Sequence, residues 1–118
     1  MSALKISAVI PVYNEEEVID EFSGRLLESL KETSDDYEIV FVVEGEDKTM
    51  EKLREFSSVN PNVKLDYNQK RLGLGKAMKR GLSLVSHGTD HVLTMDADLN
   101  HRPEEIGKLL EAQLVQTS

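Results

Sequence analysis

The sequence has 118 residues, a length that suits one compact domain, and it carries a formal net charge of −8. This acidic balance argues against nucleic acid as a partner, because such binding needs a broad basic surface. Cysteine is absent and no apolar run approaches the roughly 20 residues of a membrane helix, so we expect no disulfide and no transmembrane segment in this chain, and a cytoplasmic location.

The first half of the chain begins with a short apolar run at residues 5–13, rich in β-branched side chains, which predicts a strand buried on both faces. Residues 15–32 carry apolar side chains at three- and four-residue spacing, which predicts an amphipathic helix. Asn14 precedes this helix and is predicted to be its N-cap. A second continuous apolar run, residues 38–43, predicts the next strand.

The second half of the chain repeats the same alternation. Helical spacing of apolar residues predicts a helix over 49–58, and a shorter strand follows at 63–67. Residues 76–85 come after a glycine-punctuated segment and are predicted to be helical, followed by a strand over 90–95 and a last helix over 103–116.

The fourfold alternation of strand and helix predicts an α/β fold with a mostly parallel sheet and helices on both faces. Parallel strands place their carboxyl ends on one edge, which is where ligands bind in open α/β sheets. The segments that follow the four strands are polar, charged or glycine-rich: NEEE, EGED, NQKRLGLGK and DADLNH. We therefore expect one binding site built from these four segments.

Two aspartates, Asp96 and Asp98, flank the small Ala97 where the last strand ends. Their carboxylates suit a hard divalent cation such as Mg²⁺ or Mn²⁺, which prefers oxygen ligands and often uses one or two carboxylates together with substrate phosphates. Asn100 and His101 could complete or flank such a site. The alternative interpretation is that the aspartates cap the final helix and solvate a turn.

A basic, glycine-rich segment follows the third strand, and its glycines would allow a phosphate to approach backbone amides at a helix N-terminus. Neither the P-loop pattern nor the dinucleotide fingerprint is present. The alternative is a solvated basic helix face. The cations of this segment are Lys70, Arg71, Lys76, Lys79 and Arg80.

Four segments, IPVYNEEEVI, EIVFVVEGEDKT, NQKRLGLGKAMKRGL and HVLTMDADLNHRPEEI, occur in this order. Together they resemble the family 2 glycosyltransferases of GT-A fold, and within that family the dolichol-phosphate mannose synthase group. The resemblance covers about residues 5–110. Where family members commonly show V-D-D-G-S after the second strand, this chain has VVEGED, in which Glu44 keeps a carboxylate and Val43 replaces one.

The resemblance implies a metal site and a neighbouring nucleotide site. Asp96 and Asp98 match the D-x-D motif, so they would hold Mg²⁺ or Mn²⁺ and act in catalysis through it, with Asn100 as a further ligand. Glu44 would lie near the base or ribose. The residues implied to line the nucleotide site are Pro11, Tyr13, Glu15, Glu44, Gly73, Gly75, Lys76 and Asp96.

The implied activity is transfer of a sugar from a nucleotide-diphospho-sugar, expected to be GDP-mannose, to a polyprenyl phosphate with inversion at C1. Residues 1–118 would form a single, truncated GT-A nucleotide-sugar-binding domain, the Rossmann-like N-terminal half of the fold. An exposed sheet edge would permit self-association, and a lipid acceptor implies a peripheral position at the cytoplasmic membrane face. The alternatives are a non-catalytic, metal-dependent nucleotide-sugar-binding fragment, a receiver-type signalling domain and a purely structural α/β protein.

Overall fold

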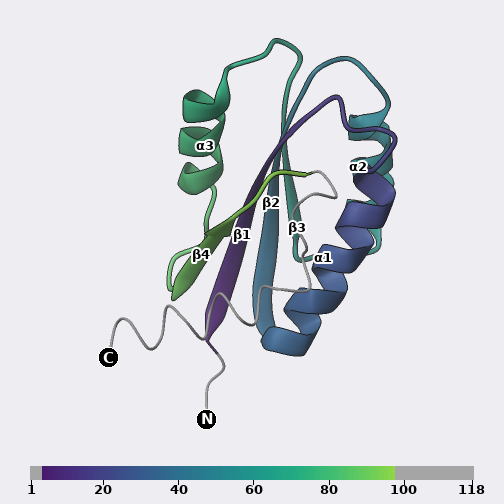
Figure 1. Cartoon of the computed structure of the whole chain (residues 1–118). Coiled ribbons are helices and arrows are strands. Elements are labelled where there is room, and N and C mark those ends of the chain that lie inside the picture. The colour runs from purple at the N-terminus through teal and green to yellow at the C-terminus, as the bar shows by residue number, and fades with distance from the viewer. Residues whose placement is uncertain (1–3, 98–118) are drawn as a thin grey trace.

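A computed structural model describes residues 4–97, which form a parallel sheet of four strands with helices on both of its faces (Figure 1). The predicted alternation is confirmed over this range, and the predicted helix at 103–116 lies outside it. The elements in chain order are β1 (Lys5–Tyr13), α1 (Ile19–Thr33), β2 (Asp36–Glu44), α2 (Thr49–Ser58), β3 (Val63–Asn68), α3 (Leu74–Ser83) and β4 (His91–Thr94).

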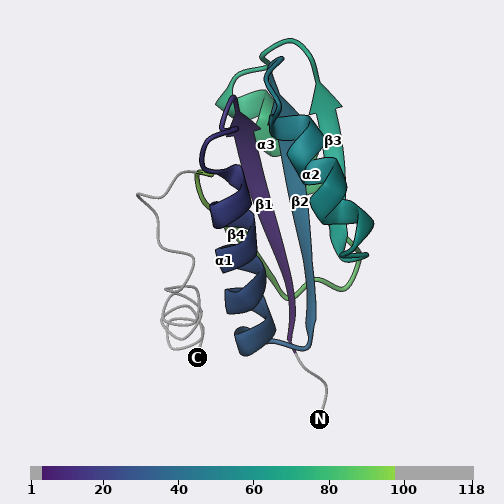
Figure 2. The same cartoon turned by 90° about the vertical axis from the view of Figure 1, so that its right-hand side faces the viewer.

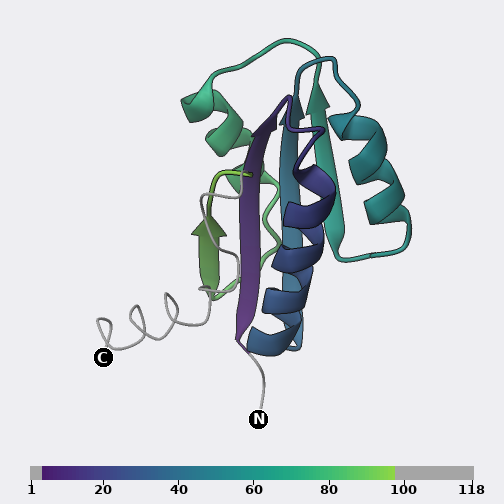
Figure 3. The ribbon, with the colours of Figure 1, turned by 45° about the vertical axis from the view of Figure 1, so that its right-hand side comes forward.

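The strands lie side by side in the order β3-β2-β1-β4, and all of them run in the same direction (Figure 3). β1 and β2 pair along their whole lengths, which brings Tyr13 opposite Glu44 at the carboxyl ends. β4 pairs with β1 only as far as Val9 opposite Thr94. The last residues of β1, including Pro11, therefore extend beyond β4, where the missing amide hydrogen of a proline is tolerated.

The order of the strands creates a switch point between β1 and β4. The chain leaves β1 through α1 toward β2 on one side, whereas β4 lies on the other side of β1 and is reached through α3. In open α/β sheets the crevice outside the carboxyl ends of two such strands is the usual ligand site. The topology thus singles out one position on the sheet edge before any side chain is considered.

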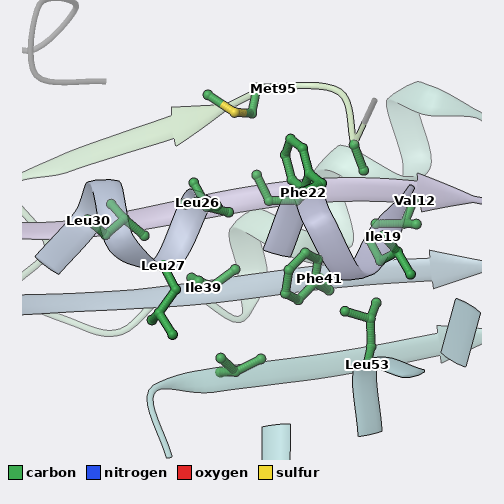
Figure 4. Packing of buried hydrophobic residues seen from close by; sticks show 14 of the residues in the cluster. Val12, Ile19, Phe22, Leu26, Leu27, Leu30, Ile39, Phe41, Leu53 and Met95 are labelled. Carbon is green, nitrogen blue, oxygen red and sulfur yellow. The ribbon is translucent and has the colours of Figure 1, made fainter. Parts of the chain in front are cut away.

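α1 and α2 cover one face of the sheet, and α3 covers the other (Figure 2). The main hydrophobic core lies between the sheet and α1, where Phe22 of α1 packs near Phe41 of β2 (Figure 4). Because side chains alternate along a strand, one half of the residues of β1 and β2 face this core. The largest fully buried side chains on this face are Ile6, Ile10, Ile19, Phe22, Leu26, Leu30, Ile39, Phe41 and Leu53.

On the opposite face α3 presents two small buried residues, Ala77 and Gly81, to the sheet. A Cβ built on Gly81 would lie 2.3 Å from a methyl carbon of Val9 and 3.1 Å from one of Val42. Both valines are fully buried. The absence of a side chain at Gly81 therefore sets how closely α3 approaches the sheet.

The start of α1 differs from the prediction. The helix begins at Ile19 rather than at residue 15, and Val18 instead of Asn14 occupies the N-cap position, with no side-chain capping bond. Asn14 has a positive φ of 49°. Glu15, Glu16 and Glu17, which the sequence places in the first helical turn, belong instead to the connection between β1 and α1. The side chains of Asp47 and Thr49 hold this connection through hydrogen bonds from the amides of Glu16 and Glu15.

Candidate functional site

A pocket of about 190 Å³ opens at the carboxyl edge of the sheet, at the switch point between β1 and β4. Its walls come from the end of β1, the end of β2, the loop that leads into α3, the first turn of α3 and the segment after β4. The lining residues are Pro11, Val12, Tyr13, Glu15, Glu44, Arg71, Gly73, Leu74, Ala77, Asp96 and Ala97. This volume is below the ~300–1,000 Å³ of typical small-molecule pockets, so the pocket suits one portion of a larger ligand.

An aromatic ring and a cation form one wall of the pocket. The guanidinium carbon of Arg71 lies 4.3 Å from the centroid of the Tyr13 ring, a cation–π contact. Both side chains are exposed, Tyr13 at 39%. This wall therefore offers a flat aromatic surface and a positive charge, which are the features that attract a base and an anionic group.

The carboxylate of Glu44 forms a second wall. Glu44 is 5% exposed, and its Oε2 accepts a hydrogen bond from the backbone N–H of Leu72. That bond joins the end of β2 to the loop between β3 and α3. A carboxylate accepts several hydrogen bonds at once, so this group can both hold the loop and receive ligand hydroxyl or N–H donors.

The loop turns into α3 at Gly73, which has a φ of 88° at the N-cap position. Only glycine adopts this left-handed conformation without strain. The turn aims the N-terminal end of α3, with Leu74 and Ala77, at the pocket. Backbone N–H groups at a helix N-terminus favour anions.

Asp96 reaches the pocket from the segment that follows β4, and it is exposed there. The predicted partners Asp98 and Asn100 lie outside the described residues. Within residues 4–97, no three His, Cys, Asp or Glu side chains gather into a metal-binding group. Asp96 is thus the one predicted metal ligand whose position this structure gives.

Six of the residues expected at the nucleotide site come together in the pocket, although they lie far apart in the sequence. They are Pro11, Tyr13, Glu15, Glu44, Gly73 and Asp96. The other two, Gly75 and Lys76, lie exposed in the first turn of α3 and are not among the pocket's lining residues. The sequence places Arg71 in a basic cluster but does not single it out as a lining residue of the site. No pattern in the sequence around Arg71 predicts that it stacks on Tyr13.

The basic cluster does not act as a unit. Arg80 makes a two-pronged ion pair with Asp66 on β3, with N–O distances of 2.7 and 2.6 Å. The hydrogen bonds from Arg80 hold the pKa of Asp66 below its ordinary value, despite partial burial. Arg80 therefore ties α3 to β3, and of the five cations Arg71 is the one that lines the pocket.

The strand order excludes the receiver-type alternative. Such domains have the order 2-1-3-4-5, in which the third strand lies beside the first. Here β3 lies beside β2 at the edge, and β1 is flanked by β2 and β4. The fold instead defines a doubly wound α/β protein with a pocket at its switch point.

Comparison with known proteins gives the family. The family model described as glycosyl transferase family 2 matches residues 7–115. The chain belongs to this family.

Relatives of known name agree with this assignment. The chain is 43% identical over 110 residues to a dolichol-phosphate mannosyltransferase of Pyrococcus furiosus, covering 92% of this chain and 30% of that protein. It is 35% identical over 109 residues to an undecaprenyl-phosphate 4-deoxy-4-formamido-L-arabinose transferase of Proteus mirabilis, covering 90% of this chain and 32% of the relative. The chain thus spans about a third of the length of these curated relatives.

A solved structure supports the fold. The mannosyltransferase PcManGT from Pyrobaculum calidifontis, in complex with GDP-Man and Mn²⁺, matches with a TM-score of 0.67 at 22% identity. The match covers 83% of this chain and 28% of that one. The predicted Rossmann-like N-terminal part of a GT-A fold is confirmed. Among residues 4–97, no helix is long and apolar enough to span a membrane.

Proposed function

We propose that this chain binds the nucleotide-diphospho-sugar donor of a polyprenyl-phosphate glycosyltransferase, with GDP-mannose as the donor. The observation that carries the proposal is the pocket at the switch point, which joins Tyr13, Glu44, Arg71 and Asp96. The names of the relatives and the ligands of the solved structure support the same donor and acceptor classes.

Each wall of the pocket has a role in this proposal. The stacked pair of the Tyr13 ring and the Arg71 guanidinium would hold the base beside it, since aromatic and guanidinium planes both stack on bases. Glu44 would accept hydrogen bonds from ribose hydroxyls or from base N–H groups. The N-terminal end of α3 would favour the negative charge of the diphosphate.

The oxygen atoms of the candidate ligands suit a divalent cation. Asp96 supplies a hard carboxylate oxygen at the pocket, and Asp98 and Asn100 would complete the ligand set. A cation bound there would neutralise the charge that builds on the departing nucleoside diphosphate. Either Mg²⁺ or Mn²⁺ suits oxygen ligands of this kind.

In the proposed reaction a phosphate oxygen of the acceptor forms a bond to the sugar C1 from the face opposite the leaving group. The bond from C1 to the diphosphate oxygen breaks, and its electron pair leaves with the nucleoside diphosphate, so the configuration inverts. A phosphate is already ionised near neutral pH, and positioning is therefore the main task of the protein. A lipid acceptor would place the site at the cytoplasmic membrane face.

The test is calorimetric titration of the purified chain with GDP, UDP and GDP-mannose, each with and without Mn²⁺. We expect Mn²⁺-dependent binding of GDP and GDP-mannose, weakened at least tenfold by Asp96→Asn. Asp35→Asn is the matched control, because Asp35 is an exposed aspartate just before β2, at the opposite edge of the sheet. Equal binding by wild type and Asp96→Asn would contradict the role of Asp96.

A turnover assay distinguishes a chain that catalyses sugar transfer from a chain that only binds the donor. Transfer of mannose to a polyprenyl phosphate by the chain would establish the complete activity. Metal-dependent donor binding without transfer would instead support the non-catalytic binding fragment. A folded wild-type chain that binds none of the nucleotides would contradict the proposal.

A further inference from the structure

The turn between β2 and α2, together with the first turn of α2, holds the backbone of the turn between β1 and α1. The Oγ1 of Thr49 accepts a hydrogen bond from the backbone N–H of Glu15 at 3.0 Å. Asp47 accepts one from the N–H of Glu16 at 3.3 Å, and Lys52 donates one to the carbonyl of Glu16 at 2.6 Å. The amides of Glu15 and Glu16 and the carbonyl of Glu16 are thus bound by this turn and the start of α2.

The same two turns interlock sterically. Asn14 has a φ of 49°, in the left-handed region, where residues other than glycine are uncommon. Its side chain lies against Gly45, and a Cβ built on Gly45 would fall 2.1 Å from the Oδ1 of Asn14. Gly45 itself has a φ of 103°. A side chain at position 45 would therefore collide with the side chain of Asn14.

The third strand also contributes to this arrangement. The hydroxyl of Tyr67, near the end of β3, donates a hydrogen bond to the carbonyl of Gly45 at 2.8 Å. The ends of β1, β2 and β3 are in this way linked along the carboxyl edge. The turn after β2 is fixed from one side by β3 and in turn fixes the segment after β1.

Thr49 is the most buried member of this set, with 1% of its surface exposed. Its bond to Glu15 is therefore partly shielded from water, and removing the acceptor would cost the partly buried N–H this hydrogen bond. The segment it holds carries two lining residues of the pocket, Tyr13 on one side of Asn14 and Glu15 on the other. Thr49 itself is not among the lining residues.

We infer that Thr49 is a positioning residue for the proposed nucleotide site. It acts through the Glu15 amide, and with Asp47 it fixes the backbone that presents Tyr13 and Glu15 before a donor enters. A segment ordered in advance loses less conformational entropy on binding, so affinity rises without a new contact to the ligand. This inference rests on the proposed function, because it concerns the same pocket.

The test compares Thr49→Val, which keeps the shape and removes the acceptor, with Thr49→Ser, which keeps the hydroxyl. Thr33→Val is the matched control. Its Oγ1 donates to the carbonyl of Ser29 at the far end of α1, so it loses a hydrogen bond away from the site. The readouts are amide hydrogen exchange at Glu15 by NMR, GDP affinity with Mn²⁺ by calorimetry, and unfolding in urea.

We expect Thr49→Val to speed exchange at Glu15 and to weaken GDP binding by about fivefold, the effect of one net hydrogen bond. Thr49→Ser should restore both values, and Thr33→Val should lower stability without changing either. Unchanged exchange or unchanged affinity in a folded Thr49→Val chain would overturn the inference alone. A wild-type chain that binds no nucleotide would contradict the proposed function instead.

Discussion

Replacing Glu38 by glutamine is expected to destabilise the fold by about 3 kcal/mol near neutral pH. Glu38 lies near the start of β2, at the edge of the sheet opposite the pocket, and is 5% exposed. Its Oε2 accepts hydrogen bonds from the Ser7 hydroxyl at 2.6 Å and the Ser86 amide at 2.8 Å. Its Oε1 accepts from the Ser86 hydroxyl at 2.8 Å and the Lys64 ammonium at 2.9 Å.

The magnitude follows from the pKa shift of Glu38 and from the hydrogen bonds that cause it. Burial by itself raises the pKa of Glu38, but the hydrogen bonds from Ser7, Ser86 and Lys64 outweigh it and lower the pKa from 4.5 to about 2. One pKa unit is worth ~1.4 kcal/mol, so this shift corresponds to about 3 kcal/mol. Glutamine would also place an NH₂ group against donors, and each lost bond to a charged acceptor costs ~1.5–3 kcal/mol.

The effect has a defined pH dependence. Because the pKa is lower in the folded chain than in the unfolded one, the charged Glu38 stabilises the fold fully above the unfolded pKa of 4.5. This stabilisation is lost as the pH falls from 4.5 through about 2. The difference in unfolding free energy between wild type and Glu38→Gln should therefore shrink over that window.

Urea denaturation of both chains at several pH values between 7 and 2.5 measures this difference. Glu28→Gln is the control, since the Glu28 side chain is 71% exposed and, within residues 4–97, pairs with Lys31 at 3.9 Å, and exposed ion pairs of this kind contribute little. A Glu38→Gln effect below about 1 kcal/mol at pH 7, well under the value expected from the pKa shift, would refute the reasoning. So would a difference that stays constant down to pH 2.5.

Three further perturbations test the packing and the pocket. Gly81→Ala should lower the free energy of unfolding in urea by about 1–2 kcal/mol, because the new Cβ would lie 2.3 Å from a buried valine methyl. Gly24→Ala, in α1, has open space around the new Cβ and should raise the same free energy by up to about 1 kcal/mol. Tyr13→Ala should weaken GDP binding about tenfold in calorimetry through loss of stacking, and equal affinity would exclude this ring from the site. Asp66→Asn removes the charged partner of Arg80 and should lower the melting temperature at pH 7. Because the pKa of Asp66 is lowered in the folded chain, the melting temperatures of the variant and the wild type should converge as the pH falls below the ordinary aspartate pKa. Melting temperatures measured at several pH values check this prediction.

The sequence by itself determined the secondary-structure elements and the edge of the sheet at which the pocket lies. Continuous apolar runs predicted strands that are buried in the structure, and three- and four-residue spacing predicted the amphipathic α1 and α2. These signals are local, because the spacing of apolar residues within one helix or strand depends only on which face of that element is buried. Alternation then implied parallel strands, and polar segments after them marked the carboxyl edge.

Only the tertiary structure decided the strand order, the start of α1 and the partners of the charged side chains. The first glutamates of the predicted helix lie outside α1 because Thr49 and Asp47 bind their backbone. Arg71 and Arg80 are near neighbours in a basic segment, yet one stacks on Tyr13 and the other pairs with an aspartate of β3. Each outcome depends on a contact between segments far apart in the chain, and periodicity within a single element carries no information about such contacts.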